Sequence, residues 1–286
     1  MGKALVRRRH SAFAAVLAAL VMAAGLAAAP AQAVDKAKYI ALGDSFAAGQ
    51  GAGPYLDDCF RSENSYSELA DEAKAVKLVV NAACTGKTTQ GVVDTQLLKL
   101  KKSTEVVTIT AGGNNIGFGA IITSCGVALA GATPGDACGT AINGAMAQIL
   151  GGQLKSDLLS MIKSVRAAAP NAKIVVTGYP YLLDPIEAGR TDAPAVFIYQ
   201  ATQLSDLLNG TIWDAAAAAD DAAKDDPKVQ FVDVRPAFLG HGALSPTPWI
   251  NLIPTAPGKP VSPDNFHPNA KGYEAYFRAL SDAGAY

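Results

Sequence analysis

The chain reads KYIALGDS over residues 38–45, an apolar run that stops at Gly43-Asp44-Ser45. The apolar residues predict a buried β-strand, and the glycine marks its end. Asp and Ser both begin helices well, so an ordinary helix cap is one interpretation of this turn. The other interpretation is chemical. A serine at a helix start lies among free backbone N–H groups and a dipole that favour a developing negative charge.

Four more apolar segments predict strands, at residues 78–80, 106–110, 174–177 and 229–234. Helical patterns lie between and after them, at residues 63–75, 97–100, 143–168 (with a weak point at Gly151-Gly152) and 194–224, and from Pro268 onward. The Gly-rich segment 119–140 predicts a long loop outside the sheet, cross-linked by its two cysteines. Near-continuous apolar strands that alternate with helices are typical of a parallel sheet covered on both faces. The sequence therefore predicts one α/β domain, a three-layer α/β/α sandwich with a central parallel sheet of about five strands.

Polar and glycine residues follow the second and third predicted strands. Gly86 comes after the second, and Gly112-Gly113-Asn114-Asn115 comes after the third. A glycine lets the backbone approach a bound group, and an asparagine amide can donate an N–H to an oxyanion. Taken singly, each is equally well explained as an ordinary turn. Ligands of open α/β sheets nevertheless bind at the carboxyl ends of the strands, where these residues fall.

One histidine stands out as a general base. His267 follows Asp264 by three residues, a spacing at which the carboxylate can orient the imidazole. A surface histidine beside an N-capping acid is the simpler alternative. His10 falls within the predicted signal peptide over residues 1–33, and His241 has no acid at a matching spacing, although its loop is a candidate wall of the site. His267 is therefore the strongest candidate.

Together, and in this order, these residues resemble the SGNH hydrolase family, also called GDSL esterases and lipases. Ser45, Gly86, Asn114 and His267 match the four residues that name the family. The resemblance extends from Tyr39 to Tyr286. The words ALGDS at 41–45, AGGN at 111–114 and FHPN at 266–269 are similar to those of the secreted actinobacterial lipases.

The resemblance implies a flavodoxin-like SGNH hydrolase fold and a role for each matched residue. Ser45 would attack an ester carbonyl, and His267 would take its proton and return it to the leaving alcohol. Asp264 would orient His267, although some members of the family use a main-chain carbonyl instead. The amides of Ser45 and Gly86 and the side chain of Asn114 would form the oxyanion hole. Water would then hydrolyse the acyl-enzyme, without a cofactor.

The sequence departs from the family pattern at two places. Asn115 stands where the family usually has Asp, which predicts altered hydrogen bonding in that loop of an active enzyme. Secreted relatives often carry a third disulfide in the loop after the fifth strand, and this chain has no cysteine there. We therefore expect a looser loop at 246–263.

Four cysteines remain to be paired, at positions 59, 84, 125 and 138. An even number in an exported chain indicates two disulfides. Of the three possible pairings, local spacing favours Cys125–Cys138, which leaves Cys59–Cys84. A zinc site is the rival interpretation. The chain has no Cys-x-x-Cys pair and only three histidines, so we expect no metal.

The N-terminal segment predicts export. Residues 1–10 are cationic, residues 11–29 are almost wholly apolar, and Ala31-Gln32-Ala33 has the pattern that signal peptidase accepts. A signal peptide over 1–33 is favoured over a membrane anchor, and the export route stays open. A secreted, monomeric domain over 34–286 is then expected. Its net charge of −5, without long charge runs, does not favour nucleic acid as a partner.

Apolar residues near the predicted site favour a lipid-like ester as substrate. Ile116 and Phe118 follow the Asn114 turn and Trp249 precedes His267, so these side chains are candidates for an acyl groove. This favours a lipase or esterase that acts on fatty acyl esters, including phospholipids. The alternatives are a carbohydrate acetylesterase that acts on polysaccharide and a non-catalytic binding module on the same fold.

Overall fold

The computed structural model describes residues 35–223, 228–254 and 261–286. The predicted signal peptide lies outside the described residues. Backbone contacts divide the chain into Met1–Asp35 and Lys36–Tyr286, and every element below belongs to the second unit. None of the helices in the described part of the chain has the length and apolar character needed to cross a bilayer.

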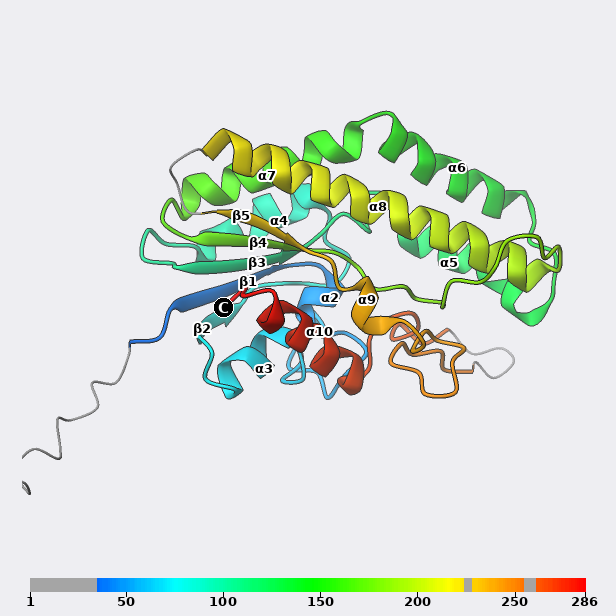
Figure 1. The fold of residues 1–286 in the computed structure, drawn as a ribbon, viewed down its shortest axis with the longest axis horizontal. Helices are drawn as coiled ribbons and strands as arrows, with labels where there is room; N and C mark the ends of the chain where they lie inside the picture. The colour runs from blue at the N-terminus through cyan, green and yellow to red at the C-terminus, as the bar shows by residue number, and fades with distance from the viewer. Residues whose placement is uncertain (1–34, 224–227, 255–260) are drawn as a thin grey trace, which may run out of the picture. The chain divides into compact units, whose positions relative to one another are not determined.

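A five-stranded parallel sheet forms the centre of Lys36–Tyr286 (Figure 1). Its strands are β1 (Lys38–Gly43), β2 (Lys77–Asn81), β3 (Val106–Thr110), β4 (Lys173–Thr177) and β5 (Val229–Val232). They lie in the order β2-β1-β3-β4-β5, and every neighbouring pair is parallel. β3 is buried at all five positions because it has a strand on each side and helices on both faces. The predicted sheet is confirmed.

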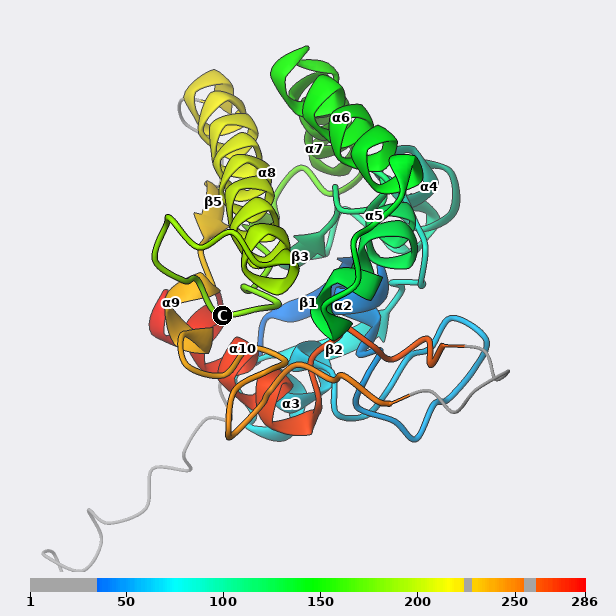
Figure 2. The ribbon, with the colours of Figure 1, turned by 90° about the vertical axis from the view of Figure 1, so that its right-hand side faces the viewer.

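Helices cover both faces of the sheet (Figures 1 and 2). One layer contains α2 (Ser45–Ala48), α3 (Tyr66–Glu72) and α10 (Ala270–Asp282), with α9 (Arg235–Phe238) packed on α10. The other contains α4 (Thr89–Thr95), η1 (Leu97–Lys99), α5 (Phe118–Cys125), η2 (Gly126–Ala130), α6 (Asp136–Leu150), α7 (Gln153–Ala168) and α8 (Ala193–Ala223). In Figure 1, α5 and α8 extend beyond the carboxyl ends of the strands, which makes them walls for anything bound there.

Three details of the predicted helices are corrected. The helix predicted over 143–168 is two helices, α6 and α7, which break at Gly151-Gly152, where Gly152 adopts φ +79°. The segment 119–140 is largely helical, because α5, η2 and the start of α6 fall within it. Its small residues leave a weak apolar stripe, so the helical period is hard to detect. α4 was not predicted.

Both disulfides form as the cysteine spacing favours. Cys59 pairs with Cys84 at a Cα–Cα distance of 4.4 Å, and Cys125 pairs with Cys138 at 4.8 Å. The first bond joins the loop after α2 to the loop after β2. The second ties the end of α5 to the first turn of α6.

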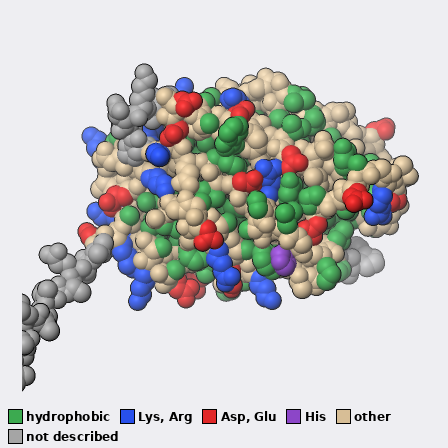
Figure 3. All heavy atoms as spheres, viewed as in Figure 1, with side chains coloured by type: hydrophobic (Ala, Val, Ile, Leu, Met, Phe, Trp, Pro, Cys, Tyr) green, Lys and Arg blue, Asp and Glu red, His purple; other side chains and the backbone are tan. Residues whose placement is uncertain are grey.

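On the face shown in Figure 3, basic and acidic side chains are interspersed among apolar ones.

The turn after β1 depends on a close approach between two backbones. Gly43 has φ +134°, and a Cβ at this position would lie 2.9 Å from the backbone nitrogen of Thr110 and still closer to its oxygen. The next residue donates its N–H to the same carbonyl, with 2.9 Å between Asp44 N and Thr110 O. Ser45 is therefore placed directly beside the end of β3.

We predict that Gly43→Ala lowers the free energy of unfolding by at least about 2 kcal/mol, because alanine resists a positive φ and its methyl group collides with backbone. Urea denaturation measures this loss. The matched control is Gly131→Ala. Gly131 also has a positive φ, +79°, but open space surrounds the position of its Cβ, so a loss of about 1 kcal/mol is expected there. Equal losses in the two variants would contradict the close approach.

Candidate active site

Ser45 is the first residue of α2, as the sequence predicts. Asp44 caps this helix, and its Oδ1 accepts a hydrogen bond of 3.0 Å from the N–H of Phe46. α2 lasts only four residues and ends at Gly49 in the left-handed conformation. The N–H groups of a first helical turn have no partners inside the helix. The serine hydroxyl thus stands beside backbone donors that are suited to an anion.

His267 meets Ser45 across the fold. Its Nε2 lies 2.8 Å from the Ser45 Oγ, although the two residues are 222 positions apart in the chain. The loop that carries His267 is fastened to Asn251, which donates its N–H to the His267 carbonyl at 2.9 Å and accepts the N–H of Phe266 at 2.8 Å. The packing of α10 against α3 brings this loop to the ends of the strands.

The imidazole is oriented by a main-chain carbonyl rather than by Asp264. Nδ1 lies 3.1 Å from the carbonyl oxygen of Asn265, while the Asp264 carboxylate accepts a hydrogen bond from the Tyr55 hydroxyl. The cause is a tight turn over 264–267, closed by the His267 N–H on the Asp264 carbonyl, with Phe266 at φ +61°. This geometry corrects the predicted Asp264 contact and agrees with the main-chain alternative.

The protonation state of His267 follows from its surroundings. Burial lowers the pKa of the imidazole to about 4, against the opposing pull of the Asn265 carbonyl and the Asp264 charge. The ring is therefore uncharged at neutral pH. A carbonyl oxygen can only accept a hydrogen bond, so Nδ1 carries the proton and Nε2 is the acceptor for the Ser45 hydroxyl.

The other two predicted oxyanion residues, Gly86 and Asn114, lie on adjacent loops. Asn114 lines the same cavity as Ser45, and one N–H of its amide donates to the Lys87 carbonyl at 3.0 Å, which leaves the other N–H to serve a ligand. Gly86 is exposed at φ +74°. The side chain of Gln50 links this region to the histidine loop, because it accepts from Thr85 Oγ1 at 2.6 Å and donates to the Pro263 carbonyl at 2.5 Å.

Asn115, the departure from the family pattern, anchors the start of α4. Its Oδ1 accepts from the Thr89 N–H at 3.0 Å, and its Nδ2 donates to Thr89 Oγ1 at 2.8 Å. Nδ2 also lies 3.4 Å from Asp157 Oδ2, on α7. A carboxylate at position 115 would repel Asp157 where the amide attracts it. The hydrogen bonding of this loop is therefore altered as the sequence predicts, and the amide at position 115 suits the nearby carboxylate of Asp157.

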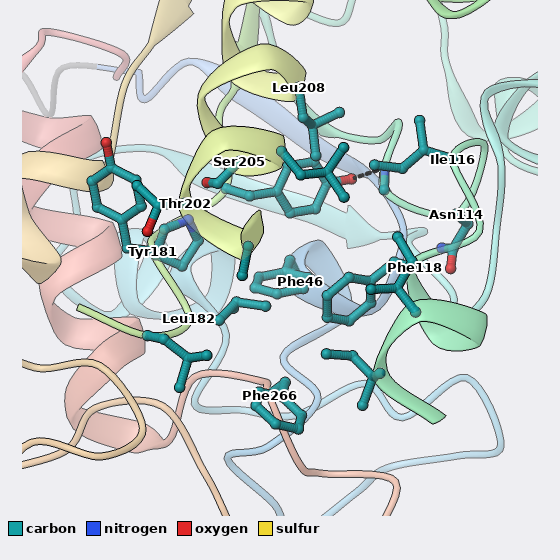
Figure 4. Close-up of a pocket in the computed structure, with 18 of the residues that line it drawn as sticks. Phe46, Asn114, Ile116, Phe118, Tyr181, Leu182, Thr202, Ser205, Leu208 and Phe266 are labelled. Carbon is teal, nitrogen blue, oxygen red and sulfur yellow. Dashed lines mark hydrogen bonds between the residues drawn. The ribbon is translucent and has the colours of Figure 1, made fainter. Parts of the chain in front are cut away.

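An apolar cavity opens beside Ser45 and Asn114 (Figure 4). Ile116 and Phe118 line it, as the sequence predicts. The opposite wall comes from the first half of α8, a contribution that sequence analysis missed. The principal apolar lining residues are Phe46, Ile116, Phe118, Ile121, Ile122, Leu182, Leu183, Phe197, Ala201, Leu204, Leu208 and Phe266.

Trp249 does not line this cavity, contrary to the prediction. Its ring stacks on His241, with centroids 3.5 Å apart and planes 4° apart, and it packs edge-on against Phe238. His241 is thereby also committed to a surface loop, where Nδ1 lies 2.8 Å from the Thr247 carbonyl. Across the residues that the structure describes, no group of three or more His, Cys, Asp or Glu side chains is arranged to hold a metal ion.

A hydroxyl bonded to an uncharged imidazole, at the ends of parallel strands and beside an apolar cavity, is the arrangement of a serine-dependent hydrolase. Comparison with known proteins agrees with this class. Residues 41–275 match the GDSL-like lipase/acylhydrolase family. The chain is 33% identical to Lipase 1 of Streptomyces coelicolor, over 93% of this chain and 96% of that protein. It belongs to the GDSL-like lipase/acylhydrolase family and is an ester hydrolase.

Solved structures of two Streptomyces proteins share the fold. The extracellular lipase of Streptomyces rimosus matches with a TM-score of 0.72 and 29% identity, over 86% of this chain and 99% of that one. Phospholipase A1 of Streptomyces albidoflavus matches with a TM-score of 0.71 and 31% identity, over the same shares of the two chains. The curated lipase of S. rimosus is 32% identical over 98% of this chain and 99% of that protein.

The lowered pKa of His267 predicts an acid-tolerant enzyme. With His267 as the candidate base, the loss of kcat/KM that ring protonation causes should come below about pH 4, at tenfold per unit, as the ring gains its proton. Chromatographic measurement of released acid gives this profile, with circular dichroism at each pH to confirm that the protein is folded. An acid limb centred near pH 6.5, the ordinary value for histidine, would contradict the burial argument.

Proposed function

We propose that this protein is a secreted serine lipase or esterase that cleaves esters of aliphatic acids through an acyl-enzyme on Ser45. The observation that carries the proposal is the 2.8 Å contact between Ser45 Oγ and His267 Nε2 at the edge of an apolar cavity. A nucleophile and its base within hydrogen-bond reach are the signature of covalent catalysis.

Each step has a group in place. His267 Nε2 takes the proton as Ser45 Oγ attacks the carbonyl carbon, and the oxyanion is held by the N–H groups of Ser45 and Gly86 and by the amide of Asn114. The imidazolium then gives its proton to the leaving alcohol. Water, deprotonated by the same nitrogen, attacks the acyl-enzyme and releases the acid and the free serine.

The carbonyl of Asn265 takes the part that a carboxylate plays in a Ser-His-Asp triad. It fixes the tautomer through Nδ1 and its dipole stabilises the imidazolium, although it carries no full charge. Asp264 contributes at longer range. Its carboxylate binds the hydroxyl of Tyr55, which in turn accepts the N–H of Gly51 at 2.9 Å, so the histidine loop is tied to the loop after α2.

The cavity supports an acyl chain rather than an acetyl group as the substrate's acid portion. Its walls, formed by Ile116 in the loop before α5, by Phe118 on α5 and by Leu204 and Leu208 on α8, are apolar, which suits a row of methylene groups. The likeness to an extracellular lipase and to a phospholipase A1 supports fatty acyl esters, phospholipids included, and supports secretion. The two disulfides suit the same oxidising location.

The first test is hydrolysis of nitrophenyl esters from acetate to palmitate by the wild type, by Ser45→Ala and by the control Ser164→Ala, a half-buried serine on α7 that does not line the cavity. Medium and long chains should be cleaved best, Ser164→Ala should match the wild type, and Ser45→Ala should lose about 10⁴-fold or more in kcat. Cleavage of acetate alone would favour the carbohydrate acetylesterase. A folded but inactive wild type would favour the binding module, and an active Ser45→Ala would place the nucleophile elsewhere.

A second prediction separates the main-chain carbonyl from an acidic triad member. Asp264→Asn keeps an oxygen for the Tyr55 hydroxyl and leaves the contact of Asn265 with the ring unchanged, so kcat should fall less than about tenfold. Loss of a true triad carboxylate costs about 10⁴-fold in kcat. Steady-state kinetics on one good ester decide the matter, with His267→Asn as the inactive reference. A loss near 10⁴-fold would restore Asp264 to the triad.

A further inference from the structure

The hydroxyl of Tyr179 joins the two turns that carry the proposed nucleophile and the proposed oxyanion donor. It donates to Asp44 Oδ2 at 2.5 Å and accepts the N–H of Gly113 at 3.0 Å. Asp44 immediately precedes Ser45, and Gly113 immediately precedes Asn114. One buried oxygen atom is thus hydrogen-bonded both to the turn after β1 and to the turn after β3.

While Asp44 is ionised, the donors and acceptors in this chain have a fixed order. The Asp44 carboxylate only accepts, from the Phe46 N–H at 3.0 Å and from the Tyr179 hydroxyl. Because the Tyr179 hydroxyl donates its hydrogen bond to Asp44, its oxygen can accept the N–H of Gly113. Burial raises the pKa of Asp44 to about 7, and the bond from Tyr179 opposes that rise. Burial and the Asp44 charge hold the pKa of Tyr179 well above its ordinary value, so it remains a donor.

The backbone of Tyr179 is itself clamped. Its N–H donates to Asn209 Oδ1 at 2.8 Å, and its carbonyl accepts from Asn209 Nδ2 at 3.1 Å. Asn209 is fully buried on α8. A Cβ on the preceding residue, Gly178, would lie 3.1 Å from the ring of Phe231 and collide with the Asn209 amide. The backbone that carries the Tyr179 side chain is therefore held in place by Asn209 and by close packing at Gly178.

The ring of Tyr179 packs against both turns as well. It meets Phe46 edge-on with centroids 5.0 Å apart, and a Cβ at Gly113 would lie 3.3 Å from its Cζ. The second glycine of the Gly112-Gly113 pair thus has a physical reason, since it leaves room for this ring. The side chain borders the cavity, and its oxygen is hydrogen-bonded to both turns.

We propose that Tyr179 is a positioning residue for ester hydrolysis, which holds the turn of Ser45 and the turn of Asn114 at the separation that the tetrahedral intermediate requires. This inference rests on the proposed function. Oxyanion donors act only at about 2.7–3.1 Å from the developing charge, and a misplacement of about 1 Å costs about 10²-fold in rate. The hydroxyl is turned toward Asp44 and Gly113, so its loss should affect the transition state more than the bound ester.

The test is Tyr179→Phe, which keeps the ring and removes only the oxygen. We expect kcat to fall by about 10- to 100-fold with KM changed less than about threefold. The loss should be the same for nitrophenyl acetate and nitrophenyl octanoate, because the oxygen serves the carbonyl end of either ester. Affinity for an alkylboronic acid, which forms a tetrahedral adduct with an active serine, should fall in parallel with kcat.

Tyr39→Phe is the matched control. Tyr39 is also fully buried, and its hydroxyl bonds to Thr108 Oγ1 at 2.6 Å on the sheet, away from both turns. It should lose a comparable free energy of unfolding and keep the wild-type kcat. Urea denaturation of both variants confirms that each is folded in the assay.

A double-mutant cycle with Asp44→Asn identifies the route of the effect. If the hydroxyl acts through Asp44, Tyr179→Phe should cost at least about threefold less in kcat in the Asp44→Asn background than alone. Three outcomes would overturn the inference: a folded Tyr179→Phe with kcat within twofold of wild type, a change in KM for octanoate only, or fully additive losses. An inactive wild type would instead overturn the proposed function.

Discussion

The site depends on the contact between the end of β1 and the end of β3. Gly43 lies so close to Thr110 that only a glycine fits, and the Asp44 N–H is bonded to the Thr110 carbonyl. Because the two strands are parallel and in register up to this pair, the turns that follow them leave the sheet side by side. Ser45 and Asn114 are neighbours because of backbone geometry, before any side chain is considered.

Burial then determines the chemistry of the site. It lowers the pKa of His267 and raises that of Asp44, since each charge would be separated from water. The two shifts have different consequences. An uncharged imidazole is the form that a general base requires. The ionised form of Asp44, by contrast, is stabilised in the interior only by hydrogen-bond donors such as the Tyr179 hydroxyl. The polar groups of the site therefore stabilise one another beside an apolar cavity.

Most of the sheet and the pairing of Ser45 with His267 could be predicted from sequence, because β-branched runs and strand-end motifs are local signals. The partner of His267 could not, since the choice between Asp264 and the Asn265 carbonyl depends on a tight turn and on Phe266 at φ +61°. Trp249 was misplaced for a related reason. Apolar character shows that a side chain will be covered, and the stacking on His241 that covers it is a tertiary contact.

α8 shows what a one-dimensional pattern leaves out. Its sequence predicts a helix and little more, yet one stripe lines the cavity through Leu204 and Leu208, while Asn209, one residue further, is hydrogen-bonded to the backbone of Tyr179 on both sides. Residues 208 and 209 are about 100° apart around the helix, so one helix turn serves the cavity and the support of the oxyanion loop at once. A shift of α8 to admit a bulkier acyl chain would move the clamp as well. The cavity wall and the hydrogen bonds that hold the backbone of Tyr179 therefore belong to the same turn of α8.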